Sequence, residues 1–368
     1  MRIRRGLGCA VSLTAFAGLA VSPMASPGLA QSPAQSPAQT PAQTLAQTPA
    51  IKAWTLPRTP DGKPDLQGVW SNASITTLER PDRYPNLVLK PAEVAKLTAE
   101  NPQNVRMATE DIATTPKEGL LTGKDLLAGR GYNAFWIDPG TKFGVVKGEV
   151  RTAWIIDPPD NRIPWSAEGK KLALAATRLA GFSDPEARPL GDRCLATGGR
   201  TGPPMINGLY NNHYQIVETS RSVMILSEMI EHARVIPIGA KGALHHGPAV
   251  LRPLFGDSIG WWEGDALVIE TTGFSPLHAI HDNPAYLSEH ATVTERFTRI
   301  REGLLYEFTV DDPVFYAQPW RGETTWRNDG AQIYEYACNE GNYAMTGILR
   351  GARVQEAHGI TPREQGGE

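Results

Sequence analysis

The chain has 368 residues, of which 41% are hydrophobic and 20% charged, and its formal net charge at pH 7 is −3. This length allows one large domain or two small ones. No block of basic residues interrupts the sequence, which argues against nucleic acid or anionic lipid as a partner.

The first thirty residues have the layout of a cleavable secretory signal. Arg2, Arg4 and Arg5 precede a mostly apolar run over residues 9–21, and small residues follow up to Ala30. The run is too short to span a membrane, and no other long apolar segment exists, so we expect no transmembrane segment. Cleavage near Ala30 would remove three of the 36 basic side chains and leave 33 against 39 acidic ones, a formal charge of −6. We therefore expect an exported protein, either periplasmic or secreted.

Residues 31–50 repeat Ser-Pro-Ala-Gln and Thr-Pro-Ala-Gln. Such a low-complexity segment cannot bury enough apolar surface to offset the entropy of ordering it, so we expect a flexible linker. A single β-rich domain is predicted over residues 51–354, and residues 355–368 should form a disordered tail.

Patterns typical of helices are few. Residues 91–100 begin with proline and carry apolar side chains at helical spacing, and Ser166 is placed to cap a helix that ends near residue 180. A closing helix is expected over 341–354. Residues 101–150 are predicted to be irregular, and a long loop of this kind is more often functional than idle. We interpret its aromatic stretch around Trp136 as a lid or wall over a pocket, with Trp136 contacting substrate. Ordinary packing of these aromatic side chains is an equally good explanation.

Short apolar runs with period-two alternation indicate strands in the rest of the chain. They lie at 151–156, 214–218, 223–230, 233–237, 266–272, 291–299 and 304–310. Eight or more short strands with few helices predict an all-β fold, an antiparallel barrel or sandwich with a lipocalin-like meander and a few peripheral helices. Closure would remove the exposed edges of the meander, and small barrels commonly hold a ligand in their mouth.

Several distinctive motifs are spread along the chain. They are Pro-Arg-Thr-Pro-Asp-Gly-Lys-Pro-Asp-Leu at 57–66 followed by Gly68 and Trp70, Asp-Pro-Pro-Asp at 157–160, Pro-Leu-Gly-Asp-Arg-Cys at 189–194, Tyr-Asn-Asn at 210–212, Trp-Glu-Gly-Asp at 262–265, Glu-Arg-Phe-Thr at 295–298 and Tyr-Glu-Tyr-Ala-Cys-Asn-Glu-Gly-Asn-Tyr at 334–343. In these motifs the chain resembles a large group of secreted bacterial proteins of unassigned function. The resemblance covers nearly the whole chain after the leader and implies fold and compartment more than chemistry. Asn339 stands where that group is expected to have histidine. If that histidine were catalytic in the group, this chain would lack the catalytic residue.

Removing the leader also removes Cys9 and leaves Cys194 and Cys338. In an oxidising compartment two cysteines favour a disulfide, and the alternative is a pair of separate buried thiols. With both cysteines in a bridge, a cysteine nucleophile is not expected.

The first candidate for acid/base chemistry is Glu228. Alternation along 223–230 places it among apolar neighbours on its strand face, where a carboxylate must be paired or have a raised pKa. A raised pKa suits a general acid or base, and an ion pair with Arg234 is the bland alternative. Glu270 and Glu307 share faces with apolar residues in the same way, so they are further candidates for inward carboxylates.

Two other groups of polar residues are candidates. His213 precedes a strand and can move protons near neutral pH, while the neighbouring Asn211 could position substrate; a structural histidine is the alternative. If the disulfide forms, it fixes Glu340 and Asn342 beside the segment that contains Arg193. Alternatively, Asn339 caps the closing helix, with Asn342 in its first turn.

A metal site is a weaker hypothesis. His245 and His246 are adjacent, and His278 and His281 lie three residues apart, but neither pair has a zinc-site spacing, and calcium patterns are missing. The sequence also lacks Gly-x-Ser-x-Gly, a phosphate-binding glycine loop and a haem-attachment motif. We therefore expect neither a metal nor another cofactor.

Two functions follow as hypotheses. The first is an exported, cofactor-independent hydrolase, lyase or isomerase acting on a small, partly apolar molecule. Acid/base work would fall to Glu228, His213 and Glu340, and the substrate would be positioned by Asn211, Arg234, Trp136, Asn342 and Glu270. The second is a non-catalytic carrier or sensor that binds an apolar ligand inside a β-barrel.

Overall fold

The computed structural model describes residues 54–113, 138–178, 181–197, 199–248, 250–251, 253–277 and 285–360. All of them belong to one compact unit that begins at Ala53. The predictions for the signal peptide, the linker, Trp136, His278, His281 and the end of the tail lie outside these residues. Within them, no helix is both long and apolar enough to cross a lipid bilayer.

The larger of two main sheets is the predicted meander. Five consecutive antiparallel strands follow one another in space, and a short sixth strand adds to the far edge. In spatial order they are β8 (Asp257–Glu263), β9 (Ala266–Thr272), β10 (Thr292–Ile300), β11 (Gly303–Asp311), β12 (Trp320–Trp326) and β4 (Ile155–Asp157). The turn between β10 and β11 depends on Gly303, whose φ of +150° and contact with the Trp326 carbonyl leave no room for a Cβ.

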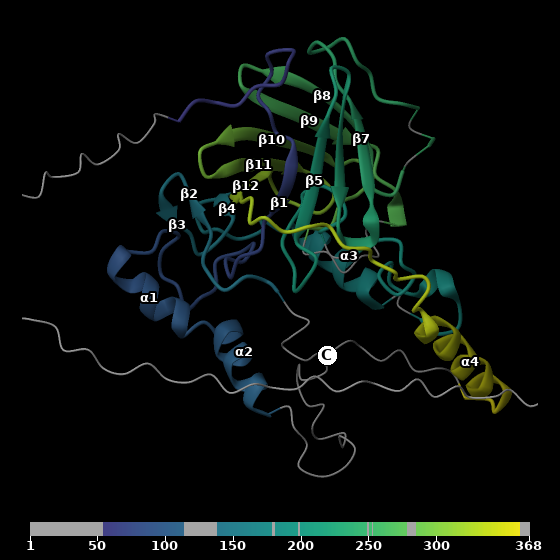
Figure 1. Ribbon diagram of the computed structural model, residues 1–368. Coiled ribbons are helices and arrows are strands. Elements are labelled where there is room, and N and C mark those ends of the chain that lie inside the picture. Colours follow the sequence, from purple (N-terminus) through teal and green to yellow (C-terminus); the bar gives the residue numbers. More distant parts are fainter. Residues whose placement is uncertain are drawn as a thin grey trace, which may run out of the picture. The chain divides into compact units, whose positions relative to one another are not determined.

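The smaller sheet has four antiparallel strands. In spatial order they are β1 (Gly68–Ser71), β5 (His213–Glu218), β6 (Ser222–Ser227) and β7 (Ala233–Pro237). Isolated backbone bridges connect the two sheets, one between Ser71 and Arg327 and one between Ile238 and Gly260. Figure 1 shows the two sheets as adjacent layers. The prediction of an all-β, antiparallel fold with few helices is confirmed, although neither sheet closes on itself within the described residues.

Aromatic side chains fill the space between the sheets. Tyr214 from the small sheet stacks on Trp326 from the large one, with ring centroids 4.5 Å apart. Phe297 and Tyr306 pack against the same tryptophan at 5.4 and 5.0 Å. All four side chains are almost fully buried and belong to one hydrophobic cluster. The interior is thus a packed core, which holds the hairpin of β5 and β6 firmly against the meander.

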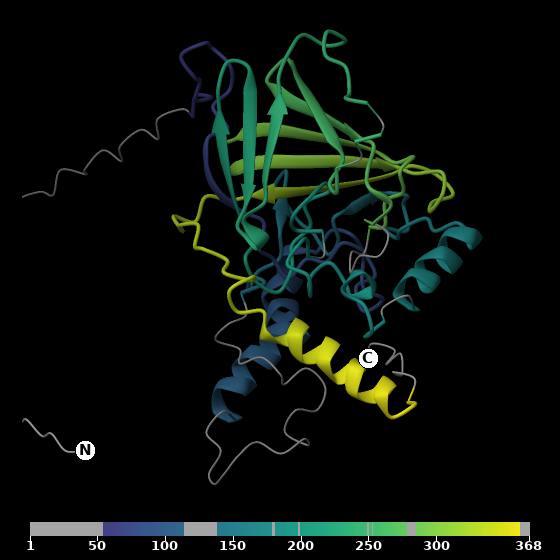
Figure 2. The same cartoon turned by 90° about the vertical axis from the view of Figure 1, so that its right-hand side faces the viewer.

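The helices lie outside this core. They are α1 (Pro91–Ala99), α2 (Pro102–Ala113), α3 (Ala167–Arg178) and α4 (Tyr343–Ala357), with short 3-10 turns η2 (Pro185–Ala187) and η3 (Met229–Glu231). Figures 1 and 2 both show the α-helices beyond one end of the sheets rather than between them. Part of the stretch predicted to be irregular is regular, because it contains α2 and the small hairpin of β2 (Val145–Val146) and β3 (Glu149–Val150).

Candidate functional site

The predicted pair of Glu228 and His213 is brought together at one end of the β5–β6 hairpin. His213 begins β5, and Glu228 follows the last residue of β6. The Glu228 Oε2 atom lies 3.0 Å from His213 Nδ1, and the Glu228 carboxylate is almost fully buried. The strand predicted over 223–230 is therefore wrong at its end, since Glu228 already has helical backbone angles and leads into η3. It is buried because of its place beside β5 and not because of strand alternation.

The second nitrogen of His213 also faces a carboxylate. Its Nε2 atom lies 3.2 Å from Asp329 Oδ2, in the loop after β12. The hydrogen bond with Glu228 raises the pKa of His213, burial opposes this, and Asp329 adds to the increase. Burial raises the pKa of Asp329, but hydrogen bonds from the Ala331 backbone and His213 outweigh it, and the pKa is lowered. We call His213, Glu228 and Asp329 the histidine clamp, because the geometry is that of an imidazolium between two carboxylates.

The histidine clamp holds the chain that follows β12. Besides the contact with Asp329, the second oxygen of Glu228 accepts a hydrogen bond from the backbone N–H of Tyr334 at 3.4 Å. Two residues further on, the Tyr336 N–H donates to Glu231 at 3.1 Å. To act as a base, His213 would first have to release one of its two carboxylates. In this arrangement its role is to fasten the chain.

Arg234 does not pair with Glu228. It lies on β7 and forms an ion pair of 2.6 Å with Glu295 on β10, inside the core. The Tyr306 hydroxyl donates a hydrogen bond to the same carboxylate at 2.8 Å. Arg234 and Glu295 are 6% and 0% exposed. The alternative partner proposed for Glu228 is thus wrong, and Arg234 serves to join the two sheets.

The predicted disulfide between Cys194 and Cys338 is confirmed, with an S–S distance of 2.03 Å. Next to it, Asn342 is the N-cap of α4, since its side chain accepts from the Met345 N–H at 3.2 Å and donates to the Asp192 carbonyl at 2.7 Å. The alternative in which Asn339 caps the helix is wrong.

The structure does not bring Glu340 and Asn211 into one site. Glu340 is exposed in the turn before α4. Asn211 has a left-handed backbone, with φ of +53°, in the loop before β5. Its neighbour Asn212 is the buried amide of this motif, and its side chain donates to the carbonyls of Asp138 and Gly208 at 2.9 and 3.0 Å.

Glu270 and Glu307 face outward, which corrects their predicted inward orientation. Both line an open groove of about 530 Å³ on the outer face of the large sheet. Glu270 lies 3.2 Å from Nε2 of His246, whose Nδ1 faces Asp257 at 3.0 Å. Among the residues described, no group of three or more histidine, cysteine or acidic side chains is arranged to hold a metal ion.

A pocket lies at the other end of the β5–β6 hairpin, beneath the motif at residues 57–66. The motif folds back on itself through a bridge between Arg58 and Pro64, with Gly62 in a left-handed turn at φ of +79°. Arg58 is anchored to Asp265 on the turn after β8 by an ion pair of 2.9 Å. Two motifs distant in the sequence therefore meet here and border an open pocket of about 340 Å³, which we call the hairpin pocket.

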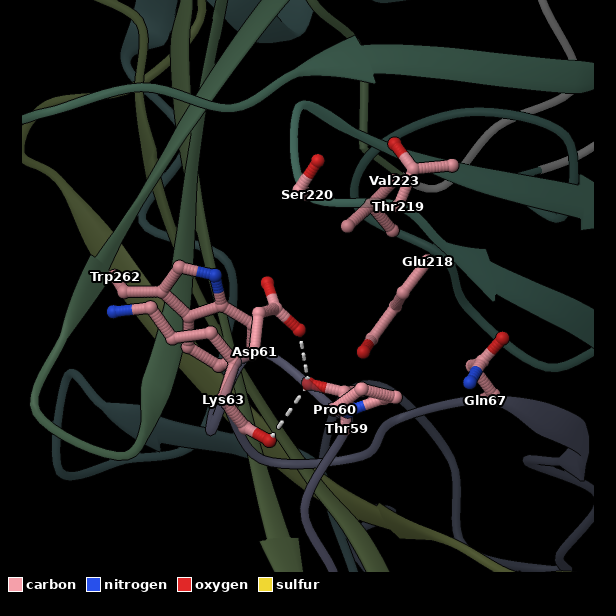
Figure 3. A pocket seen from close by; sticks show the side chains of 10 residues that line it. All are labelled: Thr59, Pro60, Asp61, Lys63, Gln67, Glu218, Thr219, Ser220, Val223 and Trp262. Atoms are coloured by element: carbon pink, nitrogen blue, oxygen red, sulfur yellow. Dashed lines mark hydrogen bonds between the residues drawn. The ribbon is translucent and has the colours of Figure 1, made fainter.

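Figure 3 shows the walls of the hairpin pocket. The indole ring of Trp262 forms one wall, and the Lys63 ammonium lies 6.0 Å from its ring centroid. Asp61 comes from the motif, and its carboxylate accepts a hydrogen bond of 2.6 Å from the Thr59 hydroxyl. Glu218 and Ser220, from the end and turn of the hairpin, face the cavity from the other side.

Glu218 is the titratable group with the most unusual environment in this pocket. Burial raises its pKa to about 7, and repulsion from Asp65 and Asp61 adds to the increase, while a hydrogen bond from the Leu66 N–H, 2.9 Å long, opposes it. No ion pair with a cation compensates the carboxylate among the described residues. A carboxyl group balanced between its two forms near neutral pH, in a cavity of ligand size, is a candidate acid/base group.

The alternation along residues 214–218 is the sequence signal that points to Glu218. Residues 214–218 were predicted as a strand, and alternation puts Glu218 on the same face as Tyr214 and Ile216, both buried. The criterion applied to Glu228, when applied here, identifies a carboxylate that does lie on the inner face of a strand.

Comparisons with known proteins give no match: no protein-family model, curated protein or solved structure resembles the chain closely enough to be reported.

Proposed function

We propose that the protein is an exported enzyme that uses Glu218 as a general acid or base on a small molecule held in the hairpin pocket. The observation that carries this proposal is the partly buried Glu218 carboxyl group, which lines a pocket of about 340 Å³ and has no cationic partner among the described residues. Burial raises its pKa to about 7. The reaction class remains a cofactor-independent hydrolysis, elimination or isomerisation. Each of these reactions needs a group that can donate and accept a proton near neutral pH. An ordinary surface glutamate does not serve, because it is almost fully ionised at that pH.

The surroundings of Glu218 support this role. The Leu66 N–H fixes the Oε1 atom, so the carboxyl group has a defined orientation and Oε2 remains for a substrate. Lys63 and Asp61 line the same cavity and can position polar groups of a ligand, and Trp262 offers an apolar face. The motif that folds over the pocket is one of those in which the chain resembles the group of secreted bacterial proteins. The disulfide also suits export, since such bonds persist in oxidising compartments.

The histidine clamp is the weaker place for this chemistry. The Nδ1 and Nε2 atoms of His213 lie 3.0 and 3.2 Å from carboxylate oxygens. A substrate would have to displace Asp329 before it could exchange a proton with the imidazole. Glu218 needs no such displacement.

A carrier or sensor is the alternative function. The region between the sheets is filled by the aromatic core, so a ligand carried there would have to displace several buried rings. A carrier would more easily use the hairpin pocket itself. The two functions then differ in whether the bound molecule is converted.

A turnover screen separates these possibilities. The purified protein is incubated with a mixture of metabolites at pH 7, and consumed and formed compounds are identified by mass spectrometry. For a substrate found in this way, Glu218→Gln should lower kcat/KM by about 10²–10⁴-fold, and the wild-type profile should change slope near pH 7. Glu302→Gln, an exposed glutamate in the turn after β10, is the matched control and should retain full activity.

Three outcomes decide between the alternatives. Full activity of Glu218→Gln together with inactive His213→Ala and Glu228→Gln would move the site to the histidine clamp. A compound found bound by native mass spectrometry but never converted would establish the carrier. Loss of turnover only in Glu218→Gln supports the proposed enzyme.

A further inference from the structure

We infer that the hairpin pocket takes a neutral polyhydroxylated ligand, a saccharide of one or two rings, with the Trp262 indole as the platform beneath a sugar ring. This inference rests on the proposed function, because it names the substrate class for the same pocket. It follows from three properties of the walls: their charges of both signs, their mixture of donors and acceptors, and their aromatic face.

The pocket walls carry charges of both signs. Asp61 and Lys63 line the pocket from one turn and carry opposite charges, and in Figure 3 the Lys63 side chain runs across the Trp262 ring. Glu218 adds a second carboxyl group, whose charged form is disfavoured by burial. An anionic ligand would meet two carboxyl groups and a cationic ligand would meet an ammonium group. A neutral polar ligand avoids both repulsions.

The polar groups suit hydroxyl groups in particular. A sugar hydroxyl both donates and accepts, and the walls present acceptors in Asp61 and Glu218, a donor in Lys63, and groups of both kinds in Ser220 and Gln67. Two of these are held in place by the protein, since Thr59 donates to Asp61 and the Leu66 N–H donates to Glu218. Fixed carboxyl groups lose little further freedom when a ligand binds.

Trp262 provides the apolar part of the contact. Its ring is only partly buried, and strand alternation turns it to the opposite face of β8 from Trp261, which lines the groove on the outer side. The ring face carries negative partial charge and attracts positively polarised groups, which at present include Lys63 at 6.0 Å. The C–H groups on one side of a sugar ring are such groups. The cavity volume lies near the lower end of the range for small-molecule sites, about 300–1,000 Å³, which fits one or two rings.

Binding is tested on the intact protein with defined probes. Glucose, galactose, N-acetylglucosamine, lactose, maltose and cellobiose are titrated and followed by saturation-transfer NMR and tryptophan fluorescence, with glucuronate and glucosamine as charged counterparts. At least one neutral sugar should bind, and should bind more tightly than the charged sugars. Trp262→Ala should weaken this binding about tenfold, Trp262→Phe should restore part of it, and Trp261→Ala should leave it unchanged.

Trp262 packs partly against the core, so Trp262→Ala could weaken binding by disturbing the fold. A second variant, at a residue outside the core, tests the pocket independently. Asp61 is exposed, so Asp61→Ala should leave the thermal midpoint unchanged while weakening binding about threefold to tenfold. Absence of binding by every neutral sugar, stronger binding of a charged one, or equal effects of the Trp261 and Trp262 variants would overturn the inference. If no sugar binds but Glu218→Gln abolishes turnover of another molecule, the inference fails and the enzyme stands. A sugar that binds without being converted leaves the inference standing and removes the enzyme.

Discussion

Glu218 and Glu228 lie at opposite ends of one hairpin, where β5 pairs with β6 from Glu218 opposite Val223 to Tyr214 opposite Ser227. Glu228 has His213 at 3.0 Å and a backbone N–H on its other oxygen. Glu218 has a single backbone N–H from Leu66 and a cavity in front of it. Two glutamates of one hairpin therefore differ in their partners: both carboxylate oxygens of Glu228 have one, whereas Glu218 has a partner for one oxygen only.

The difference separates a structural carboxylate from a candidate functional one. His213 is the ionic partner of Glu228, and no comparable partner of Glu218 is found in the part of the chain that the structure describes. A buried carboxylate with an ionic partner has part of its desolvation cost offset, whereas one without a partner lowers stability when ionised, and such groups occur frequently at functional sites. Burial alone is thus a poor indicator of function, and the missing partner is the better one.

Removing the disulfide should have the largest effect, and it acts on the Glu228 end. Cys194 and Cys338 are 144 residues apart, so the double change to serine should lower the free energy of unfolding by about 4–5 kcal/mol in the chain-entropy model. Urea denaturation measures this loss. Ligand binding in the hairpin pocket should persist below the transition, because the pocket lies at the opposite end of the β5–β6 hairpin. A loss below about 1 kcal/mol would show that the segment after β12 is held mainly by the histidine clamp.

Glu228→Gln should have the next largest effect, and its size should depend on pH. The pKa of His213 is raised, so the stabilisation from its charged form is complete below its unfolded pKa of about 6.5 and is lost as pH rises through the higher folded value. We expect Glu228→Gln to lower the free energy of unfolding by about 2–3 kcal/mol at pH 6 and by clearly less at pH 9. Chemical denaturation at the two pH values measures this.

An NMR titration of the His213 ring gives the independent check. The pKa of His213 should decrease in Glu228→Gln. The control is Glu335→Gln, at an exposed glutamate in the segment held by the histidine clamp, and it should change neither the pKa of His213 nor the free energy of unfolding. Equal losses at pH 6 and pH 9 would contradict the charged clamp.

The all-β fold could be predicted because the meander follows local rules. The predicted strand at 266–272 coincides with β9, and the strands predicted at 291–299 and 304–310 lie almost entirely within β10 and β11. Alternation and short turns fix these strands without reference to the rest of the molecule. The disulfide was likewise predicted from compartment and cysteine count alone.

The candidate site was harder to predict because it depends on contacts between distant segments. Arg234 pairs with Glu295 of the other sheet, and this depends on how the sheets pack. Similarly, Glu218 meets Leu66, which is 152 residues away. Glu228 was placed on a strand that in fact ends at Ser227. Period-two alternation assigns a face only within a strand, so a misplaced strand end gave Glu228 the wrong reason for its burial.

The smallest effect expected is a gain in stability from Glu218→Gln, and it tests the comparison most directly. The pKa of Glu218 is raised from 4.5 to about 7, so between these values the folded state binds more protons than the unfolded state, and stability falls as pH rises through this window. Glutamine resembles the protonated form and avoids that loss. At pH 8 the variant should be more stable than the wild type by about 1–2 kcal/mol, which is below the full linkage value because the side chain is partly exposed. At pH 4.5 the two should be equal, and Glu302→Gln should match the wild type at both values. Denaturant unfolding at pH 4.5 and 8 measures the difference. A Glu218→Gln protein that is less stable than the wild type at pH 8 would mean that this carboxylate has an ionic partner, and the two ends of the hairpin would then not differ in kind.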